Sequence, residues 1–370
     1  LKSYGLVPCH GDPCVFTMEK EMQTPDGPRK ERLFIGVYVD DMFVLSSHDD
    51  EHSLYHHFTA KLQDSWDVED EGPVSDLLNV EIERVGDCVI LKQAAYIKKL
   101  VANYLADGVI PPSHQASKTP ADDSLTQLVA DALCQDAADI DPVLLKKYQS
   151  LVGALLYCAV NTRPDVAVSV GYLCRAMGKP TPELYEAAQR VLFYLGRHGE
   201  IGLCYRGDDA PCSGMTDSDW GVKHSTSGFV FKLSQAAISW ASKRQPSVAL
   251  SSCEAELMAA SEAAKEAAFL GDYLAELGVR DDSPMRLAMD NQAGRDLAYN
   301  PEHHSRTKHI QRRHYFVREM VEDFRITVPF VGTNDNDADF FTKVISKSTK
   351  FFELRDRIMN VPSHQRLSRA

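Results

Sequence analysis

The sequence lacks the features that identify several common classes of protein. Its nine cysteines include no C-x-x-C pair and no Cys/His spacing typical of zinc ligands, which predicts reduced, buried thiols. The chain has no basic-then-apolar start of the kind that opens a secretory signal peptide. No apolar run approaches the roughly 18–20 residues of a membrane span, and no internal repeat is present. A chain of 370 residues with 44% hydrophobic content is expected to form about two or three globular domains.

An excess of positive charge is also missing. The formal net charge is −13 at pH 7, which argues against a protein that coats nucleic acid nonspecifically. One segment has the opposite bias, because residues 303–318 hold several cations and no acid: Arg306, Lys308, Arg312, Arg313 and Arg318. The hypothesis for this segment is contact with nucleic-acid phosphates, and the alternative is a solvated helix face.

The N-terminal part of the chain predicts short strands and helices. Residues 33–46 (LFIGVYVDDMFVLS) indicate two apolar strands joined at Asp40-Asp41, a hairpin with carboxylates at its tip. Further strands are expected at residues 77–84 and 88–92, and helices at residues 50–62 and 94–105. Residues 111–142, rich in Pro, Ser and Asp, are interpreted as a surface excursion with one short helix.

The second half of the chain changes from helices to a mixed pattern. Helices are predicted at residues 144–159, 163–176 and 182–198, the last with Thr181 as its N-cap and Pro182 as its first residue. After a boundary near residues 207–211, strands are predicted at residues 213–217, 227–233, 237–243, 286–290 and 327–331. A long helix is expected over residues 253–277, ended by Gly278. Three strands followed by alternating helices and strands predict a mixed sheet with helices on its faces.

One carboxylate falls on the apolar side of that long helix. The helix opens with Ser251-Ser252-Cys253-Glu254, a capping-box pattern. At about 100° per residue, Glu256 lies inside the apolar stripe, between Cys253 and Ala260. A carboxylate that faces the core is costly unless it is paired or binds a metal. The alternative is a side chain at the edge of the stripe that reaches water.

Three aspartates stand where strands end or helices begin. Asp217 closes the first strand of the C-terminal part, Asp290 ends the strand at residues 286–290, and Asp339 begins the helix after the last strand. Each has an ordinary explanation as a cap or turn residue. Carboxylate oxygens are, however, the ligands that Mg²⁺ prefers, and two such ions can stabilise both oxygens of a phosphodiester cleavage.

A series of short segments, in a fixed order, carries a family resemblance. The segments are DPCVF (12–16), YVDDM (38–42), LVGALLY (151–157), TDSDWG (216–221), STSGFVF (225–231), ISWASKRQ (238–245), VALSSCEAELMAA (248–260), MDNQ (289–292), HSRTKHI (304–310) and ADFFTK (338–343). In these segments the chain resembles the reverse transcriptase and ribonuclease H part of copia-type LTR-retrotransposon Pol polyproteins. The resemblance covers nearly the whole chain except the last twenty or so residues.

The resemblance implies a metal site made of four carboxylates, Asp217, Glu256, Asp290 and Asp339, which would hold two Mg²⁺ ions (Mn²⁺ being an alternative). Asp219 and Glu254 remain as rival positions for the first two carboxylates. The implied reaction is hydrolysis of the RNA strand of an RNA–DNA hybrid, with the rest of the Pol polyprotein as a further partner and no membrane. Localisation is expected to be cytoplasmic, with nuclear passage.

The resemblance also implies a domain order. Residues 1–110 would form part of a reverse-transcriptase palm and the start of a thumb, 111–207 a helical thumb and connection, 208–347 an RNase H-like five-stranded sheet flanked by helices, and 348–370 a tail. Asp40 and Asp41 match part of the polymerase metal site, and we expect a further catalytic aspartate to lie in a segment that precedes Leu1. The chain is therefore interpreted as a fragment that cuts RNA but does not synthesise DNA. The alternatives are an inert transposon remnant and a polymerase that is active only with an upstream segment.

Overall fold

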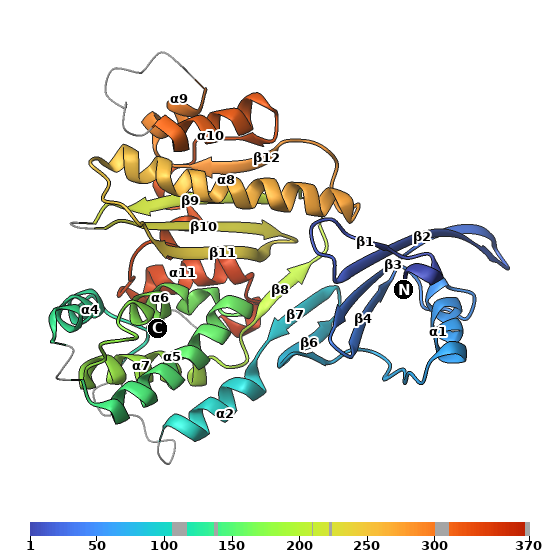
Figure 1. Ribbon diagram of the computed structural model, residues 1–370, viewed down its shortest axis with the longest axis horizontal. Coiled ribbons are helices and arrows are strands. Elements are labelled where there is room, and N and C mark those ends of the chain that lie inside the picture. Colours follow the sequence, from blue (N-terminus) through green and yellow to red (C-terminus); the bar gives the residue numbers. More distant parts are fainter. Residues whose placement is uncertain (106–116, 137–139, 209, 222–223, 300–310, 367–370) are drawn as a thin grey trace. The chain divides into compact units, whose positions relative to one another are not determined.

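The computed structural model describes residues 1–105, 117–136, 140–208, 210–221, 224–299 and 311–366 (Figure 1). They divide into two units, Leu1–Val74 with Phe269–Ser283, and Ser75–Ala268 with Pro284–Ala370. The first unit contains Asp40 and Asp41, and the second contains all four carboxylates predicted to bind metal. Both units combine helices with antiparallel or mixed sheets, so the α/β and α+β expectation is confirmed at that level.

The first unit is built on a four-stranded antiparallel sheet in the order β1-β2-β3-β4. Its strands are β1 (Val7–Pro8), β2 (Val15–Thr24), β3 (Gly27–Tyr38) and β4 (Asp41–Ser46). Helix α1 (Leu54–Ser65) begins after Ser53, whose hydroxyl accepts a hydrogen bond of 3.3 Å from the His56 N–H. The helix buries Leu54, Phe58 and Leu62, four residues apart, in the apolar core of this unit.

The hairpin that carries the two aspartates differs by one residue from the prediction. Tyr38 pairs with Asp41, so the turn residues are Val39 and Asp40, and Asp41 is the first residue of β4. Val39 has a φ of 55°, a left-handed conformation that is uncommon for a β-branched residue. Both aspartates are exposed. The sequence alone did not indicate this turn, because Val and Asp are not the residues that a tight hairpin turn favours.

The second unit begins with a four-stranded antiparallel sheet in the order β5-β6-β7-β8. Its strands are β5 (Asp76–Leu77), β6 (Val80–Val85), β7 (Cys88–Lys92) and β8 (Leu203–Arg206). The predicted strand at residues 77–84 is interrupted, since Leu78 and Asn79 have φ angles of 54° and 59° and form a turn. β8 was not predicted, because four residues give little periodicity and their pairing with β7 is distant in the sequence.

Helices pack around one apolar core in this unit. They are α2 (Ala94–Tyr104), α4 (Ser124–Cys134), α5 (Pro142–Asn161), the 3-10 turn η4 (Pro164–Val166), α6 (Ala167–Arg175), α7 (Pro182–Arg197) and α11 (Ser348–Met359). The Thr181 cap of α7 is confirmed, because its hydroxyl accepts from the Leu184 N–H at 3.2 Å. α4 confirms the short helix predicted within residues 111–142, but it buries Leu125, Val129 and Ala132 in the core, so the predicted surface location is wrong for this part.

Helix α5 is, by length and composition, apolar enough to cross a membrane, which corrects the expectation that no such run exists. One face of it belongs to the core, where Leu151, Leu155 and Cys158 are buried. The buried Tyr148 hydroxyl also donates to the Leu173 carbonyl of α6 at 2.8 Å. The core helix of a soluble protein passes the same test as a membrane span, so one such helix is weak evidence for a span.

The second sheet of this unit has five strands in the order β11-β10-β9-β12-β13. They are β9 (Ser213–Asp219), β10 (Thr226–Leu233), β11 (Ala236–Arg244), β12 (Met285–Met289) and β13 (Ile326–Thr327). β9, β10 and β11 are antiparallel neighbours, whereas β12 pairs parallel with β9 and β13 parallel with β12. This is the mixed sheet that the sequence predicted, with the last strand shorter than expected.

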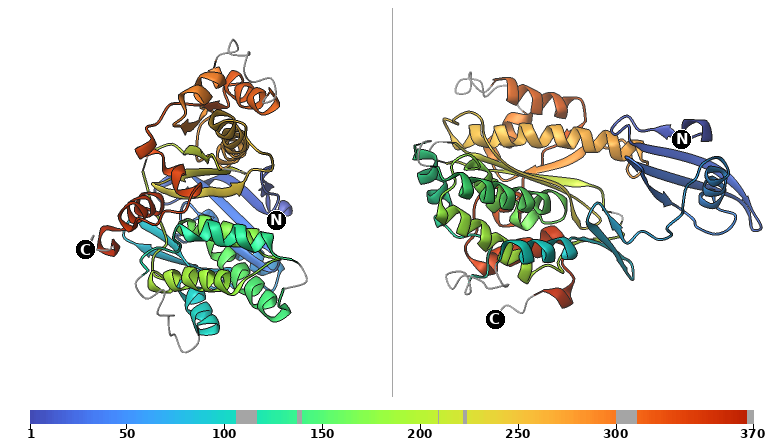
Figure 2. Two further views of the ribbon diagram at one scale, coloured as in Figure 1. Left: turned by 90° about the vertical axis from the view of Figure 1, so that its left-hand side faces the viewer. Right: turned by 60° about the horizontal axis from the view of Figure 1, so that its bottom comes forward.

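Helices cover both faces of the five-stranded sheet. Figure 2 shows α8 (Ser252–Glu276) on one face and the helices that include α6 on the other. Val230, Ala237 and Trp240 pack into the helical core, and the Trp240 indole N–H donates to the Ala159 carbonyl at 2.8 Å. On the opposite face, the Ser239 hydroxyl donates to Glu266 of α8 at 2.6 Å. The remaining helices are α9 (Gln292–Tyr299) and α10 (Gln311–Glu322).

Candidate metal centre

Asp217 lies on β9, the central strand of the five-stranded sheet. Its side chain is 7% exposed, and its Oδ2 accepts a hydrogen bond of 2.7 Å from the Thr342 hydroxyl. Asp219, the rival position two residues further along, is half-buried and ends the strand. Of the two, only Asp217 belongs to the group of acidic side chains that converge in the described part of the chain.

Asp290 reaches the same edge of the sheet through parallel pairing. Met289, the last residue of β12, pairs with Thr216 of β9, so the next residue of each strand is a carboxylate. The sequence could predict both strand ends but not that β12 would insert beside β9, because that pairing is made by residues about seventy positions apart.

Glu256 completes the group from the first turns of α8. Its side chain is 7% exposed, and its Oε2 is buried without a hydrogen-bond partner among the described residues. Glu254 has a different role, because its N–H donates to the Ser251 hydroxyl at 3.1 Å and its Oε2 accepts from the Leu250 N–H at 2.7 Å. The predicted cap at Ser251 is therefore confirmed, and Glu254 serves that cap.

One ligand atom from each of Asp217, Glu256 and Asp290 lies within 4.8 Å of the other two. Burial, together with the charges of Asp217 and Asp290, raises the pKa of Glu256 to about 8. Burial and the charges of Asp290 and Asp339 raise the pKa of Asp217 to about 6, although the Thr342 hydrogen bond opposes the change. Three neighbouring carboxylates, two of them buried and Asp290 half-buried, fit a hard divalent cation, because their charges repel one another and one buried oxygen has no hydrogen-bond partner among the described residues.

Asp339 stands beside this group rather than in it. It lies on the 3-10 helix η7 (Asp337–Phe341), is 9% exposed and forms an ion pair with Lys343. Its charge contributes to the raised pKa of Asp217, which places it near that carboxylate. The structure therefore brings three of the four predicted carboxylates together and holds the fourth next to them with a lysine partner.

Close packing fixes η7 on the sheet. The buried Asn336 side chain donates to the Thr216 carbonyl at 3.1 Å and accepts from the Ala338 N–H at 3.1 Å. A Cβ added at Gly228 would come within 2.8 Å of the Thr342 methyl and 3.0 Å of the Ala338 carbonyl. Glycine at this position of β10 is thus what lets η7 approach the strand.

The other predicted site residues lie elsewhere. Asp40 and Asp41 are exposed on the hairpin of the first unit, and neither belongs to a group of three or more metal-ligating side chains among the described residues. Arg306 and Lys308 lie outside the described residues, as do the side chains of Arg312 and Arg313, whose backbone is in α10.

Sequence reasoning missed two residues that contact the site. Thr342 donates to Asp217, and Lys343 pairs with Asp339. Both stand in the ADFFTK segment that carried the family resemblance, directly after Asp339. The motif contained both residues, but it did not indicate where their side chains would lie. A 3-10 helix precedes them where an α-helix was expected, and the two kinds of helix direct the following residues differently.

Comparison with known proteins identifies the family. Residues 22–110 match the family described as reverse transcriptase (RNA-dependent DNA polymerase). The chain is 33% identical, over 372 residues, to the retrovirus-related Pol polyprotein from transposon TNT 1-94 of Nicotiana tabacum; the match covers 98% of this chain and 26% of that protein. It is 30% identical over 353 residues to the Pol polyprotein from transposon RE1 of Arabidopsis thaliana, covering 94% of this chain and 22% of that protein.

A shorter relative is matched over most of its own length. The chain is 31% identical over 251 residues to the putative transposon Ty5-1 protein of Saccharomyces cerevisiae, which covers 66% of this chain and 75% of that protein. The chain spans about a quarter of the length of the Pol polyproteins that it matches. With these relatives and the motif series in agreement, the chain belongs to the family of copia-type retrotransposon Pol polyproteins and contains its reverse-transcriptase-like region.

Proposed function

We propose that the second unit carries a ribonuclease H site that hydrolyses the RNA strand of RNA–DNA hybrids. The observation that supports this most is the convergence of Asp217, Glu256 and Asp290 within 4.8 Å at one edge of a mixed five-stranded sheet. Residues 208–347 are the proposed RNase H-like domain, residues 1–110 a partial palm, and residues 111–207 the thumb and connection.

The proposed metal ligands are the three converging carboxylates, with Asp339 beside them. Bound Mg²⁺ would activate a water molecule and stabilise the leaving 3′-oxygen of the phosphodiester. The protein's own contribution is to hold the ligands in place: the Thr342 hydroxyl orients Asp217, and Lys343 balances the charge of Asp339. Glu256 and Asp217 must lose their protons to bind metal, and because their pKa values are raised, metal binding should be favoured at neutral to alkaline pH and weakened at acidic pH.

Recognition of the hybrid is proposed to have two parts. Contacts to 2′-hydroxyl groups would distinguish RNA from DNA, because that group is the chemical difference between the strands. Arg306, Lys308, Arg312 and Arg313 are proposed to contact phosphates, which would make binding salt-dependent. Replacing Arg312 and Arg313 by alanine should weaken hybrid binding at moderate salt, and unchanged affinity would exclude them as contacts.

The test of the nuclease is cleavage of a hybrid labelled on either strand, with Mg²⁺, by the full chain and by Asp290→Asn. Cleavage of the RNA strand alone, lost in this variant, is the expected result. Asp296→Asn is a matched control, because the Asp296 side chain on α9 is 44% exposed and pairs with Arg295 and Gln292 instead of the carboxylate group. No cleavage by a folded chain would favour the alternative of an inert transposon remnant.

For the first unit we propose that Asp40 and Asp41 do not support DNA synthesis by this chain alone. They are exposed, and among the described residues they have no third carboxylate within the spacing of a metal group. Primer extension with a template, deoxynucleotides and Mg²⁺ tests this, and template-dependent incorporation would refute it.

A further inference from the structure

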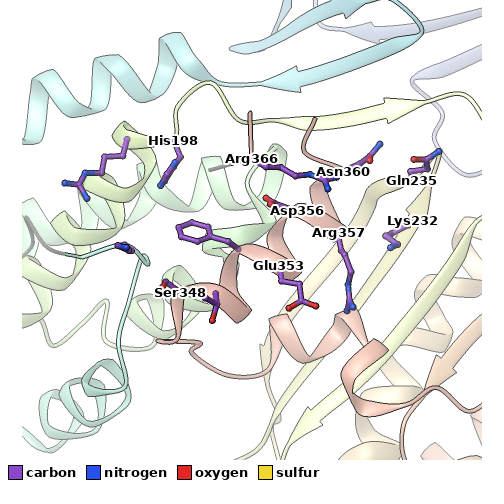
Figure 3. Close-up of a pocket in the computed structure, with 13 residues that line it drawn as sticks. His198, Lys232, Gln235, Ser348, Glu353, Asp356, Arg357, Asn360 and Arg366 are labelled. Atoms are coloured by element: carbon purple, nitrogen blue, oxygen red, sulfur yellow. The ribbon is translucent and has the colours of Figure 1, made fainter. Parts of the chain in front are cut away.

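A second site is indicated by a cavity of about 940 Å³ in the second unit (Figure 3). It lies between the C-terminal end of α7, the turn that joins β10 to β11, and helix α11. In Figure 3, His198 stands on one side, Gln235 and Lys232 on the other, and residues of α11 between them. The volume is within the range of small-molecule sites. None of the four carboxylates of the candidate metal centre lines this cavity.

The cavity has the opposite charge to the chain as a whole. Its cationic lining residues are Lys118, Arg197, Lys232, Arg357 and Arg366. Its acidic lining residues are Glu353 and Asp356, so cations exceed acids by three in a chain with a net charge of −13. The Asp356 carboxylate is already held by Arg355, with nitrogen–oxygen distances of 2.9 and 2.7 Å. Glu353 is exposed at the cavity and is the remaining negative charge that an anion would meet.

The N-terminal turn of α11 adds hydrogen-bond donors to the cavity wall. α11 has twelve residues, and its N-cap residue Lys347 makes no side-chain capping hydrogen bond. The first two helical residues, Ser348 and Thr349, line the cavity. An uncapped helix start offers backbone N–H groups and the positive end of the helix dipole, both of which favour an anion. Backbone donors and cationic side chains therefore meet in one cavity.

The part of the cavity lining at His198 is aromatic and uncharged. Burial, with the nearby charges of Arg355 and Arg163, lowers the pKa of His198 to about 4, so its ring is neutral at pH 7. The ring packs edge-on against Phe352, with centroids 5.9 Å apart. Cationic side chains and neutral aromatic rings in one cavity suit a ligand that has phosphate groups and a ring system.

We propose that this cavity binds the phosphate groups of a nucleotide, either free or at the end of a nucleic-acid strand. Lys118, Arg366 and the start of α11 hold the phosphates, while Glu353 opposes them. Lys232 and Arg357 have a second role, because both bind the buried Asp337 at 2.8 Å, at the start of the η7 helix that carries Asp339. Binding at this cavity requires neither metal nor cleavage, so it can be tested separately from the nuclease.

The test is calorimetric titration of the full chain in EDTA with ATP and, separately, with a short 5′-phosphorylated single-stranded DNA. Wild type is compared with the double variant Lys118→Gln/Arg366→Gln, with Glu353→Gln, and with Lys265→Gln as control. Lys265 lies on α8 with its side chain 58% exposed and is not part of the cavity lining. The double variant should bind roughly tenfold or more weakly, since a charge-assisted hydrogen bond contributes about that factor. Glu353→Gln should bind more tightly, and the control should match wild type.

The two probes distinguish the sources of phosphate. If ATP binds and the variants change its affinity as expected, the ligand is a free nucleotide. If only the DNA binds, the ligand is the phosphorylated end of a strand. If neither probe binds, or if all variants with wild-type thermal stability bind alike, the proposal is wrong. Opposite effects of Glu353→Gln and the double variant cannot come from misfolding, which keeps the result interpretable.

Discussion

Removing Mg²⁺ should make the stability of the second unit depend on pH, because two carboxylates of the candidate metal centre are buried close together. In the metal-free protein, burial and neighbouring charge raise the pKa of Glu256 from 4.5 to about 8 and that of Asp217 from 3.8 to about 6. The folded state therefore holds protons that the unfolded state has already released. The free energy of unfolding should fall as pH rises from about 4.5 and level off above about 8.

The size of this fall follows from the larger shift. Each pKa unit corresponds to about 1.36 kcal/mol, so the change at Glu256 corresponds to about 5 kcal/mol across this pH range. The repulsion between Glu256 and Asp217 already contributes to the raised pKa of Glu256, so the free-energy changes of the two groups are not added. Because the free energy of unfolding of a domain is only about 5–15 kcal/mol, a change of this size should be measurable by urea unfolding. Bound Mg²⁺ should offset it, and the stabilisation by Mg²⁺ should grow with pH over the same range.

The assay is urea unfolding from about pH 5 to about pH 9, with EDTA or with Mg²⁺, followed by tryptophan fluorescence. Trp220 and Trp240 both lie in the second unit, and the Trp220 indole donates to the Ala249 carbonyl near the start of α8. Glu256→Gln should flatten most of the dependence seen in EDTA, whereas Glu254→Gln should keep it. Equal stability of wild type at both ends of the range in EDTA, or the same slope in Glu256→Gln, would refute the electrostatic reasoning.

Three further substitutions test specific contacts in the second unit. Gly228→Ala should destabilise the protein by about 1–3 kcal/mol in thermal melts and reduce stabilisation by Mg²⁺, because its Cβ would meet η7 at 2.8–3.0 Å. Arg163→Met should cost about 3–5 kcal/mol in urea melts, because it leaves the buried Asp165 carboxylate without its bidentate partner. Thr342→Val removes the hydrogen bond that lowers the pKa of the β9 carboxylate, so Mg²⁺ binding measured by calorimetry should need a higher pH.

Each of these substitutions has a control in the same unit. Gly207→Ala adds a Cβ with nothing within 4 Å and should be neutral. Lys265→Met breaks an ion pair whose side chains are 58% and 40% exposed, and should change stability by less than about 1 kcal/mol. Thr342→Ser keeps the hydroxyl and should keep the wild-type pH dependence. If the controls behave like the test variants, the specific contacts are not the cause.

Local features of this fold could be predicted from the sequence because neighbouring residues determine them. The Thr181 and Ser251 caps and the end of α8 at Gly278, with a φ of 66°, follow from the chemistry of single residues. The position of Glu256 on α8 follows from helical periodicity. The turn at Val39 could not be predicted in this way, because its left-handed conformation is imposed by the pairing of β3 with β4.

Features that depend on distant pairing were not predictable from periodicity. α11 was interpreted as part of a tail, yet Phe351, Leu354 and Ile358 are buried in the same core as α5 and α7. It shows a modest apolar pattern that does not reveal which surface it will cover. The motifs that carried the family resemblance could not supply this either, because none of them lies in these residues.

The convergence of the three carboxylates of the candidate metal centre shows how the two kinds of information combine. Periodicity indicated that Glu256 faces inward, and strand ends indicated Asp217 and Asp290, but only the parallel insertion of β12 beside β9 brings them within 4.8 Å. Three neighbouring carboxylates, two of them buried, reduce stability in the absence of a cation. The Thr342 hydroxyl that donates to Asp217 supports this arrangement, which fits the proposed cation site.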